Sequence, residues 1–374
     1  MNIWPISGSQ YRPIFAIALF FFVTDLGAQE TRTKPERTGK QLFEAACAAC
    51  HGADGRGAPV STVGFDIPLP DFTDCSFASR EAAEDWFAIA HEGGPVRAFD
   101  RMMPSFGEAL TEDEIRRTVA HAQTFCDDDS WPRGELNLPR PLVTEKAFPE
   151  DEAVLTVQAA AEGSGALSPK FIYEKRFGPR NQIELAIPFS FAGRPQGGWI
   201  GGVGDLVFAF KRAMVHSLDK GSIFSLGGEA IFPTGNKDKG LGGGRTVFEP
   251  FALFGQILPG NGFLQLHGGF ELPADRRRTD EAFWRAAVGR SFTQGPYGRM
   301  WSPMIEILGA RDLEPGARNE WDLVPQVQVS LSKRQHILFN AGVRLPVTDA
   351  QPRTAQLMFY VIWDWFDGGL FSGW

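Results

Sequence analysis

The sequence predicts an α + β multidomain protein in which a small all-α domain precedes an antiparallel transmembrane β-barrel of about 12 strands. The hydrophobic pattern is helical up to about residue 130 and alternates with a period of two after about residue 150. The chain also carries 42 Gly, 32 Phe and 10 Trp in 374 residues, a load that suits turns and aromatic-rich strands.

Residues 1–28 are predicted to be a signal peptide. Arg12 precedes an apolar run over 13–23, and the small residues Gly27 and Ala28 follow. A run of this length is too short to cross a bilayer as a helix, so export is expected, with a retained membrane anchor as the alternative.

The next segment, residues 29–130, contains the pentapeptide Cys47-Ala-Ala-Cys-His51. Two thiols three positions apart can each add to one vinyl group of a haem, and the adjacent imidazole can ligate the iron. A redox dithiol or half of a zinc site also uses C-x-x-C. Because the sequence has no second C-x-x-C and 39–47 is predicted to be helical, the motif favours one covalent haem c.

The second axial ligand of the iron is predicted to be Met103, which precedes Pro104 in an irregular stretch of the chain. Adjacent Met102 cannot face the iron at the same time. His91 and His121, in predicted helices over 79–91 and 111–125, are the alternatives for a bis-His site.

Cys75 and Cys126 are the other two cysteines. In an oxidising compartment they are predicted to form a disulfide that staples this domain. Two separate buried thiols are the alternative.

These motifs resemble, in order, a class I cytochrome c domain. The resemblance covers about a hundred residues, and it implies a small helical fold with His51 and Met103 as axial ligands and no open position for oxygen. It implies an electron carrier rather than an enzyme, although an oxidoreductase role with a partner stays open. The resemblance is carried by Leu42-Phe43, Cys47–Gly52, Met103-Pro104-x-Phe106 and the helix opening Leu110–Ile115.

Charge is divided unevenly between the two halves. The net charge is −8, but residues 29–130 alone contain nineteen acidic and ten basic residues. A periplasmic redox protein with a basic face is therefore expected as a partner, and a nucleic acid is not. A merely solvated acidic surface is the alternative.

Residues 131–152 have the Pro-rich, charged composition of a linker, and residues 153–374 are predicted to form the barrel. About twelve stretches of roughly ten to twelve residues alternate between an apolar and a mostly polar face, the length needed to cross a bilayer at a tilt. In one of them, over 182–191, the apolar positions are Ile183, Leu185, Ile187, Phe189 and Phe191.

The connections between these strands support an outer-membrane barrel. Short turns such as 178–181, 259–262, 294–298 and 332–334 alternate with longer loops such as 193–203, 234–246, 274–281 and 311–320. The chain also ends in aromatic Trp374, as such barrels commonly do, although Gly368-Gly369 interrupts the expected last strand. A soluble β-sandwich or β-propeller is the alternative.

Two segments, 201–211 and 227–235, resemble the outer-membrane channel family named for the MetA pathway of phenol degradation, which implies a pore. The domain order resembles cytochrome-porin fusions that move electrons across outer membranes. A haem c electron-transfer protein is thus expected at the bacterial outer membrane, surrounded by its lipid, with the cytochrome domain facing the periplasm. It would pass electrons between a periplasmic carrier and a partner at or in the pore.

Two alternative functions are open. The barrel could be a channel for a small-molecule solute, such as an aromatic one, with the cytochrome as an accessory. The chain could also be a soluble periplasmic two-domain electron carrier.

Overall fold

The computed structural model describes residues 36–374 except 65–67, 162–164, 195–196, 276–277 and 349–352. The predicted signal peptide, residues 1–28, lies outside the described residues. Among the residues described, no helix combines the length and the apolar character that a membrane span requires.

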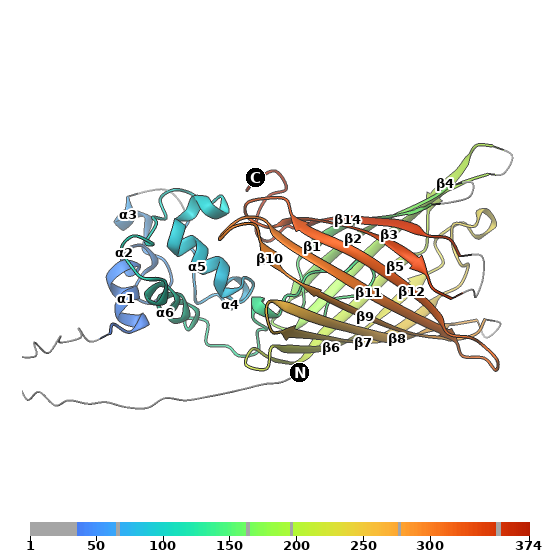
Figure 1. The fold of residues 1–374 in the computed structure, drawn as a ribbon, viewed down its shortest axis with the longest axis horizontal. Helices are drawn as coiled ribbons and strands as arrows, with labels where there is room; N and C mark the ends of the chain where they lie inside the picture. The colour runs from blue at the N-terminus through green and yellow to red at the C-terminus, as the bar shows by residue number, and fades with distance from the viewer. Residues whose placement is uncertain (1–35, 65–67, 162–164, 195–196, 276–277, 349–352) are drawn as a thin grey trace, which may run out of the picture. The chain divides into compact units, whose positions relative to one another are not determined.

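The N-terminal domain is helical (Figure 1). Its first and last helices cross at Gly39, where an added Cβ would collide with the carbonyl oxygen of Arg117. Leu42, Phe43 and Ile115, each at most 1% exposed, form its centre. The helices are α1 (Gly39–Ala46), α2 (Ala48–His51), α3 (Val60–Val63), α4 (Cys75–Ala78), α5 (Ala83–Glu92), the 3-10 turn η1 (Gly94–Arg97) and α6 (Glu112–Gln123).

Predicted helices 39–47 and 111–125 correspond to α1 and α6. The helix predicted over 79–91 begins later, at Ala83, because α4 ends at Ala78 and the chain turns before α5. Thr111 caps α6: its hydroxyl accepts a hydrogen bond from the Glu114 amide, and the Glu114 side chain accepts one from the Thr111 amide.

The rest of the chain is a closed antiparallel barrel of twelve strands, as predicted (Figure 1). Closure is made by the first and last strands, where Val154 lies opposite Ile362. Stretches β4 and β5 both pair with β3, and β9 and β10 both pair with β11, so each couple forms one interrupted strand.

The strand bounds are β1 (Glu152–Ala160), β2 (Ala166–Phe177), β3 (Asn181–Gly193), β4 (Trp199–Val203), β5 (Leu206–Ser217), β6 (Ser222–Phe232), β7 (Val247–Leu258), β8 (Gly262–Pro273), β9 (Glu281–Arg290), β10 (Phe292–Thr293), β11 (Met300–Asp312), β12 (Glu320–Ser330), β13 (Ile337–Pro346) and β14 (Gln356–Asp364).

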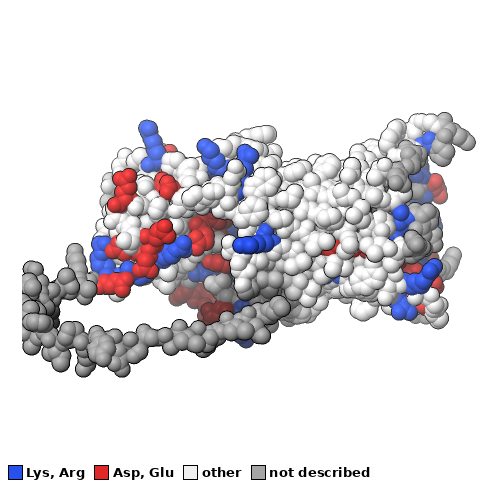
Figure 2. Space-filling model, viewed as in Figure 1, with Lys and Arg blue, Asp and Glu red and all other residues white. Residues whose placement is uncertain are grey.

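The barrel presents its apolar residues outwards. On β3, Ile183 and Phe191 are each 39% exposed, whereas Gln182 and Glu184 are 2% and 7% exposed. Figure 2 shows a broad band of wall nearly free of charged residues, with the charged ones gathered towards the two ends. A soluble sandwich or propeller would bury the apolar face instead, so that alternative is wrong. A closed barrel with an apolar outer band belongs in an outer membrane.

Two sequence-based expectations about the barrel need correction. The segment 193–203 was expected to be a long loop, but β4 within it pairs with β3 and extends the wall. Trp374 was expected to end the last strand, but β14 ends at Asp364. Trp374 lies ten residues further on, where its indole nitrogen donates to the Leu370 carbonyl oxygen at 3.1 Å.

Residues 137–151, which we call the plug, lie inside the barrel after a 3-10 turn, η2 (Gly134–Leu136). They were expected to be part of a linker. The plug instead bonds to well-separated strands of the wall: Thr144 donates to Glu306 of β11 at 2.6 Å, and the Ala147 carbonyl oxygen accepts from Ser225 of β6 at 2.6 Å. The hydroxyl of Tyr360, on β14, donates to the carbonyl oxygen of Arg140 at 2.5 Å.

Ion pairs hold the plug in place. Arg140 Nη1 lies 2.6 Å from a carboxylate oxygen of Glu174 and 3.3 Å from one of Glu152. Lys146 Nζ lies 2.9 Å from Glu152 and also pairs with Glu150. Carboxylates on the inward face of the wall need cations when water is displaced, and the plug supplies them.

Candidate functional site: a haem-binding helical domain

The C-x-x-C-H motif lies at a junction of two helices. Cys47 is both the C-cap of α1 and the N-cap of α2, and Cys50 and His51 are in α2. Gly52 follows with a φ of 73°, a conformation that favours glycine and ends the helix. Both cysteines are unpaired thiols and half-buried. The local fold thus presents two thiols and one imidazole within little more than one helical turn.

The imidazole of His51 is suited to hold a metal. Its ring stacks on Phe72 with centroids 4.9 Å apart. Burial lowers the pKa of His51, which keeps the ring neutral, and its buried Nδ1 has no hydrogen-bond partner within the described part of the chain. A neutral imidazole offers the lone pair that iron requires.

The surroundings of the motif are aromatic. Phe72 packs against Phe43 and Trp86 at centroid distances of 6.5 and 5.0 Å, and Phe125 lies 5.2 Å from Phe43. Burial, with Cys50 as the smaller cause, raises the pKa of the Cys47 thiol to about 11. Two thiols, a neutral imidazole and an apolar aromatic lining fit a c-type haem.

Met103 is held on a loop between η1 and α6. Its amide donates to the Asp100 carbonyl oxygen at 3.3 Å, and its carbonyl oxygen accepts from the Gly94 amide at 3.0 Å. Met103 is half-buried, whereas neighbouring Met102 is 47% exposed. Of the two methionines, Met103 is therefore the better ligand candidate, and its ligation of iron stays a prediction.

The two alternative histidine ligands have other neighbours. His91 Nδ1 lies 2.8 Å from a carboxylate oxygen of Glu92, and its ring lies 5.5 Å from that of Phe87. The ring of His121 packs between Phe43 and Phe125 at 5.6 and 5.3 Å. These contacts explain the positions of both histidine rings without a bound iron.

Cys75 and Cys126 form a disulfide. Cys75 begins α4 and Cys126 follows α6, so the bond joins two segments that are 51 residues apart in the sequence. It fixes the start of α4 to the segment after α6.

Contacts between the helical domain and the turns of the barrel were not predicted. Arg97, which is 6% exposed, donates to the Tyr297 carbonyl oxygen at 2.9 Å. Arg334 donates to the Ala98 carbonyl oxygen at 2.7 Å, and Arg80 pairs with Asp151. Isolated arginines carry no pattern that reveals a distant carbonyl partner, so the sequence held no usable signal for them.

Comparison with known proteins separates the two halves of the chain. The family described as "Cytochrome C oxidase, cbb3-type, subunit III" matches residues 34–121. Cytochrome c6 of Tetradesmus obliquus is 29% identical over 93 residues, which are 25% of this chain and 93% of that protein. The N-terminal region is therefore a cytochrome c-type domain, which implies haem c and electron transfer.

Solved structures match the barrel half at low identity. The COG4313 outer membrane channel from Pseudomonas putida F1 has a TM-score of 0.43 and 13% identity, covering 60% of this chain and 99% of that chain. The NanC porin has a TM-score of 0.38 and 10% identity, covering 56% and 97%. The KdgM porin has a TM-score of 0.38 and 7% identity, covering 57% and 98%.

Proposed function

We propose that this chain is a haem c electron-transfer protein which the barrel anchors in the bacterial outer membrane. The observation that supports this most is the arrangement of Cys47, Cys50 and His51 in a domain whose connection to the barrel is buried in the lumen. The redox centre is then held at the membrane instead of moving on a free tether.

In this proposal each candidate residue has a separate task. Cys47 and Cys50 would hold one haem through two thioether bonds, and His51 and Met103 would ligate its iron. When bound, the haem supplies a centre that gains and loses one electron. The aromatic cluster around Phe72 keeps water from that centre, which together with Met ligation favours a high reduction potential.

The cytochrome domain is proposed to face the periplasm. It contacts the barrel at two short turns, through Tyr297 between β10 and β11 and through Arg334 between β12 and β13. Arg334 also lies over the ring of Phe99 at 4.3 Å. Short turns of outer-membrane barrels face the periplasm, and this supports the orientation.

The filled lumen limits the routes by which electrons could reach or leave the haem. The plug occupies the space that a partner or solute in the pore would need, so exchange with a periplasmic redox protein is favoured over transfer through the barrel. The many acidic residues of the helical domain, red in Figure 2, suit a partner with a basic face. A second redox protein would complete any path across the core of roughly 30 Å.

Reconstitution in liposomes tests this function. With the cytochrome domain outside, an impermeant donor protein with a basic face is expected to reduce the haem at a rate that falls steeply with salt. The matched control is Cys47→Ser with Cys50→Ser, which should keep the SDS-resistant barrel and lose covalent haem. Solute flux across the vesicles without haem reduction would instead establish a channel.

A further inference from the structure

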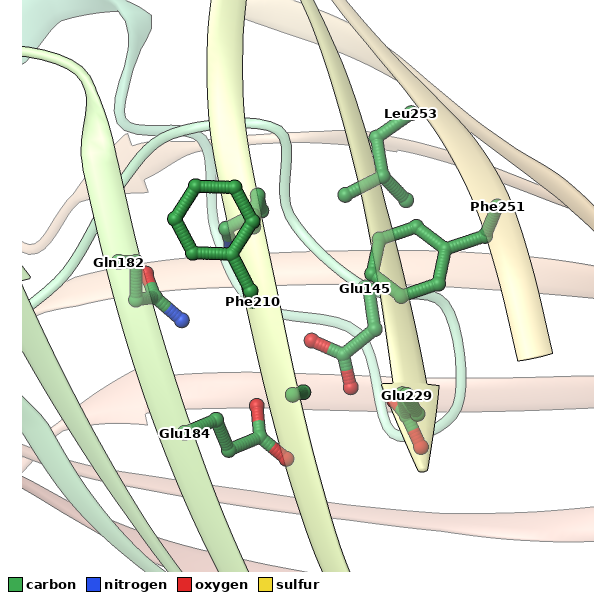
Figure 3. A pocket seen from close by; sticks show the side chains of 9 residues that line it. Glu145, Gln182, Glu184, Phe210, Glu229, Phe251 and Leu253 are labelled. Atoms are coloured by element: carbon green, nitrogen blue, oxygen red, sulfur yellow. The ribbon is translucent and has the colours of Figure 1, made fainter. Parts of the chain in front are cut away.

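Two buried carboxylates and one half-buried carboxylate converge where the plug meets the barrel wall. Glu145 belongs to the plug, Glu174 to β2 and Glu184 to β3, and one carboxylate oxygen of each lies within 4.8 Å of the others. Figure 3 shows the carboxylates of Glu145, Glu184 and the nearby Glu229 around the same small space. The three groups come from three separate segments, so folding has brought them together.

This place also has unused oxygen atoms. Glu184 is 7% exposed, and within the described ranges it makes no hydrogen bond or ion pair. Glu174 accepts from Arg140 through Oε1, but its Oε2 is buried and has no hydrogen-bond partner among the residues described. Buried carboxylate oxygens without partners are costly, and a ligand would satisfy them.

There is room for one ion beside Glu145 and Glu184, two of the three carboxylates. A cavity of about 10 Å³ lies between the plug and the wall, lined among others by Glu145, Glu184, Glu229 and Lys211. This is close to the smallest volume that holds a single water-sized particle. The carboxylates in Figure 3 border this cavity, so an ion placed there would be within their reach.

The lining of the cavity is acidic. Arg140 pairs with Glu174 at 2.6 Å and with Glu145 at 3.4 Å. The lining also holds the carboxylates of Glu184 and Glu229, with Lys211 as its single cation, although the charges of Lys170 and Arg285 also act on Glu229. An acidic lining favours a bound cation.

We propose that the lumen binds one Ca²⁺ ion between Glu145, Glu174 and Glu184. An all-oxygen donor set selects a hard cation. The three oxygens lie within 4.8 Å of one another, and the large, flexible coordination shell of Ca²⁺ accommodates such a spread more readily than the strict octahedral shell of Mg²⁺. The ion would join the plug to two wall strands.

Calcium titration of the full-length holoprotein in detergent, after removal of divalent ions with a chelator, tests this site. Calorimetry is expected to show one Ca²⁺ per chain. Glu184→Gln and Glu145→Gln should each weaken binding at least tenfold. Glu271→Gln is the matched control, because Glu271 is on β8 outside the cavity lining and its substitution should leave the affinity unchanged.

Glu145 lies in the plug, outside the strands, so Glu145→Gln keeps the test decisive if Glu184→Gln does not fold. Resistance to cold SDS reports folding of each variant. Three results would each overturn the assignment. They are no Ca²⁺ binding by the folded natural protein, Ca²⁺ binding by both folded variants with the affinity of the natural protein, and equal affinity of the natural protein for Ca²⁺ and Mg²⁺.

Discussion

At the scale of single residues, two adjacent methionines are expected to differ in function, because only Met103 is predicted to ligate the iron. Met103→Ala is expected to change the visible spectrum of the haem and to lower its reduction potential, because loss of the thioether removes a ligand that favours the reduced iron. Met102 is 47% exposed, so Met102→Ala should leave both properties unaltered. Spectroelectrochemical titration of the two variants makes the comparison, and an unchanged Met103→Ala spectrum would rule this ligand out.

Glu81, in the turn before α5, gives the helical domain a predicted dependence on pH. Burial raises the pKa of Glu81 to about 7; Asp85 adds to this rise, and a hydrogen bond with Asp367 opposes it. The folded state thus keeps a proton that the unfolded chain releases above about pH 4.5. Stability should therefore fall as the pH rises from about 4.5 to about 7, and stay low above that range.

Glu81→Gln imitates the protonated side chain. Its unfolding free energy should exceed that of the natural protein by about 1–3 kcal/mol at pH 8 and by much less at pH 5. Thermal unfolding followed by haem absorption at both pH values measures this. Glu108→Gln is the control because Glu108 is exposed. A gain that is the same at both pH values would show that ionisation is not its cause.

At the scale of elements, the plug depends on its buried cation. Arg140, 5% exposed, faces Glu145, Glu152 and Glu174. Arg140→Ala removes the ion-pair partner of Glu145 and Glu174, while Glu152 keeps Lys146, and should destabilise the barrel by about 3–5 kcal/mol. The temperature at which the barrel loses SDS resistance is expected to drop accordingly. Arg212→Ala, at an exposed position on β5, should shift it little; equal shifts would contradict a structural role for the plug.

The elements also show what the sequence could predict. Alternation over 182–191 predicted both the strand β3 and its two environments, because lipid and lumen impose a period of two. The C-x-x-C-H spacing predicted a haem attachment site because the two thiols and the imidazole lie within five consecutive residues. The plug was missed because Pro139, Arg140 and Pro141 have the composition of an exposed linker. Its burial depends on Glu152 and Glu174, whose inward direction only the closed barrel reveals.

At the scale of the whole molecule, the filled lumen predicts poor conduction. In planar bilayers the full-length protein should lack the stable open steps of a porin, because the plug contacts strands on opposite sides of the lumen, β8 through Gln265 and β1 through Glu152. A variant in which residues 137–149 are replaced by Gly and Ser of equal length is the comparison, and it should conduct ions. Steady open steps from the natural chain would refute a closed lumen.

The contacts of the plug also have a consequence for biogenesis. The carbonyl oxygen of Arg140 is held by Tyr360 of β14, while its guanidinium pairs with Glu152 at the start of β1. These two strands form the seam at which the barrel closes. The final packing of the seam therefore includes the plug. Because the plug directly follows the cytochrome domain in the sequence, we expect completion of the seam and placement of that domain at the barrel to be coupled.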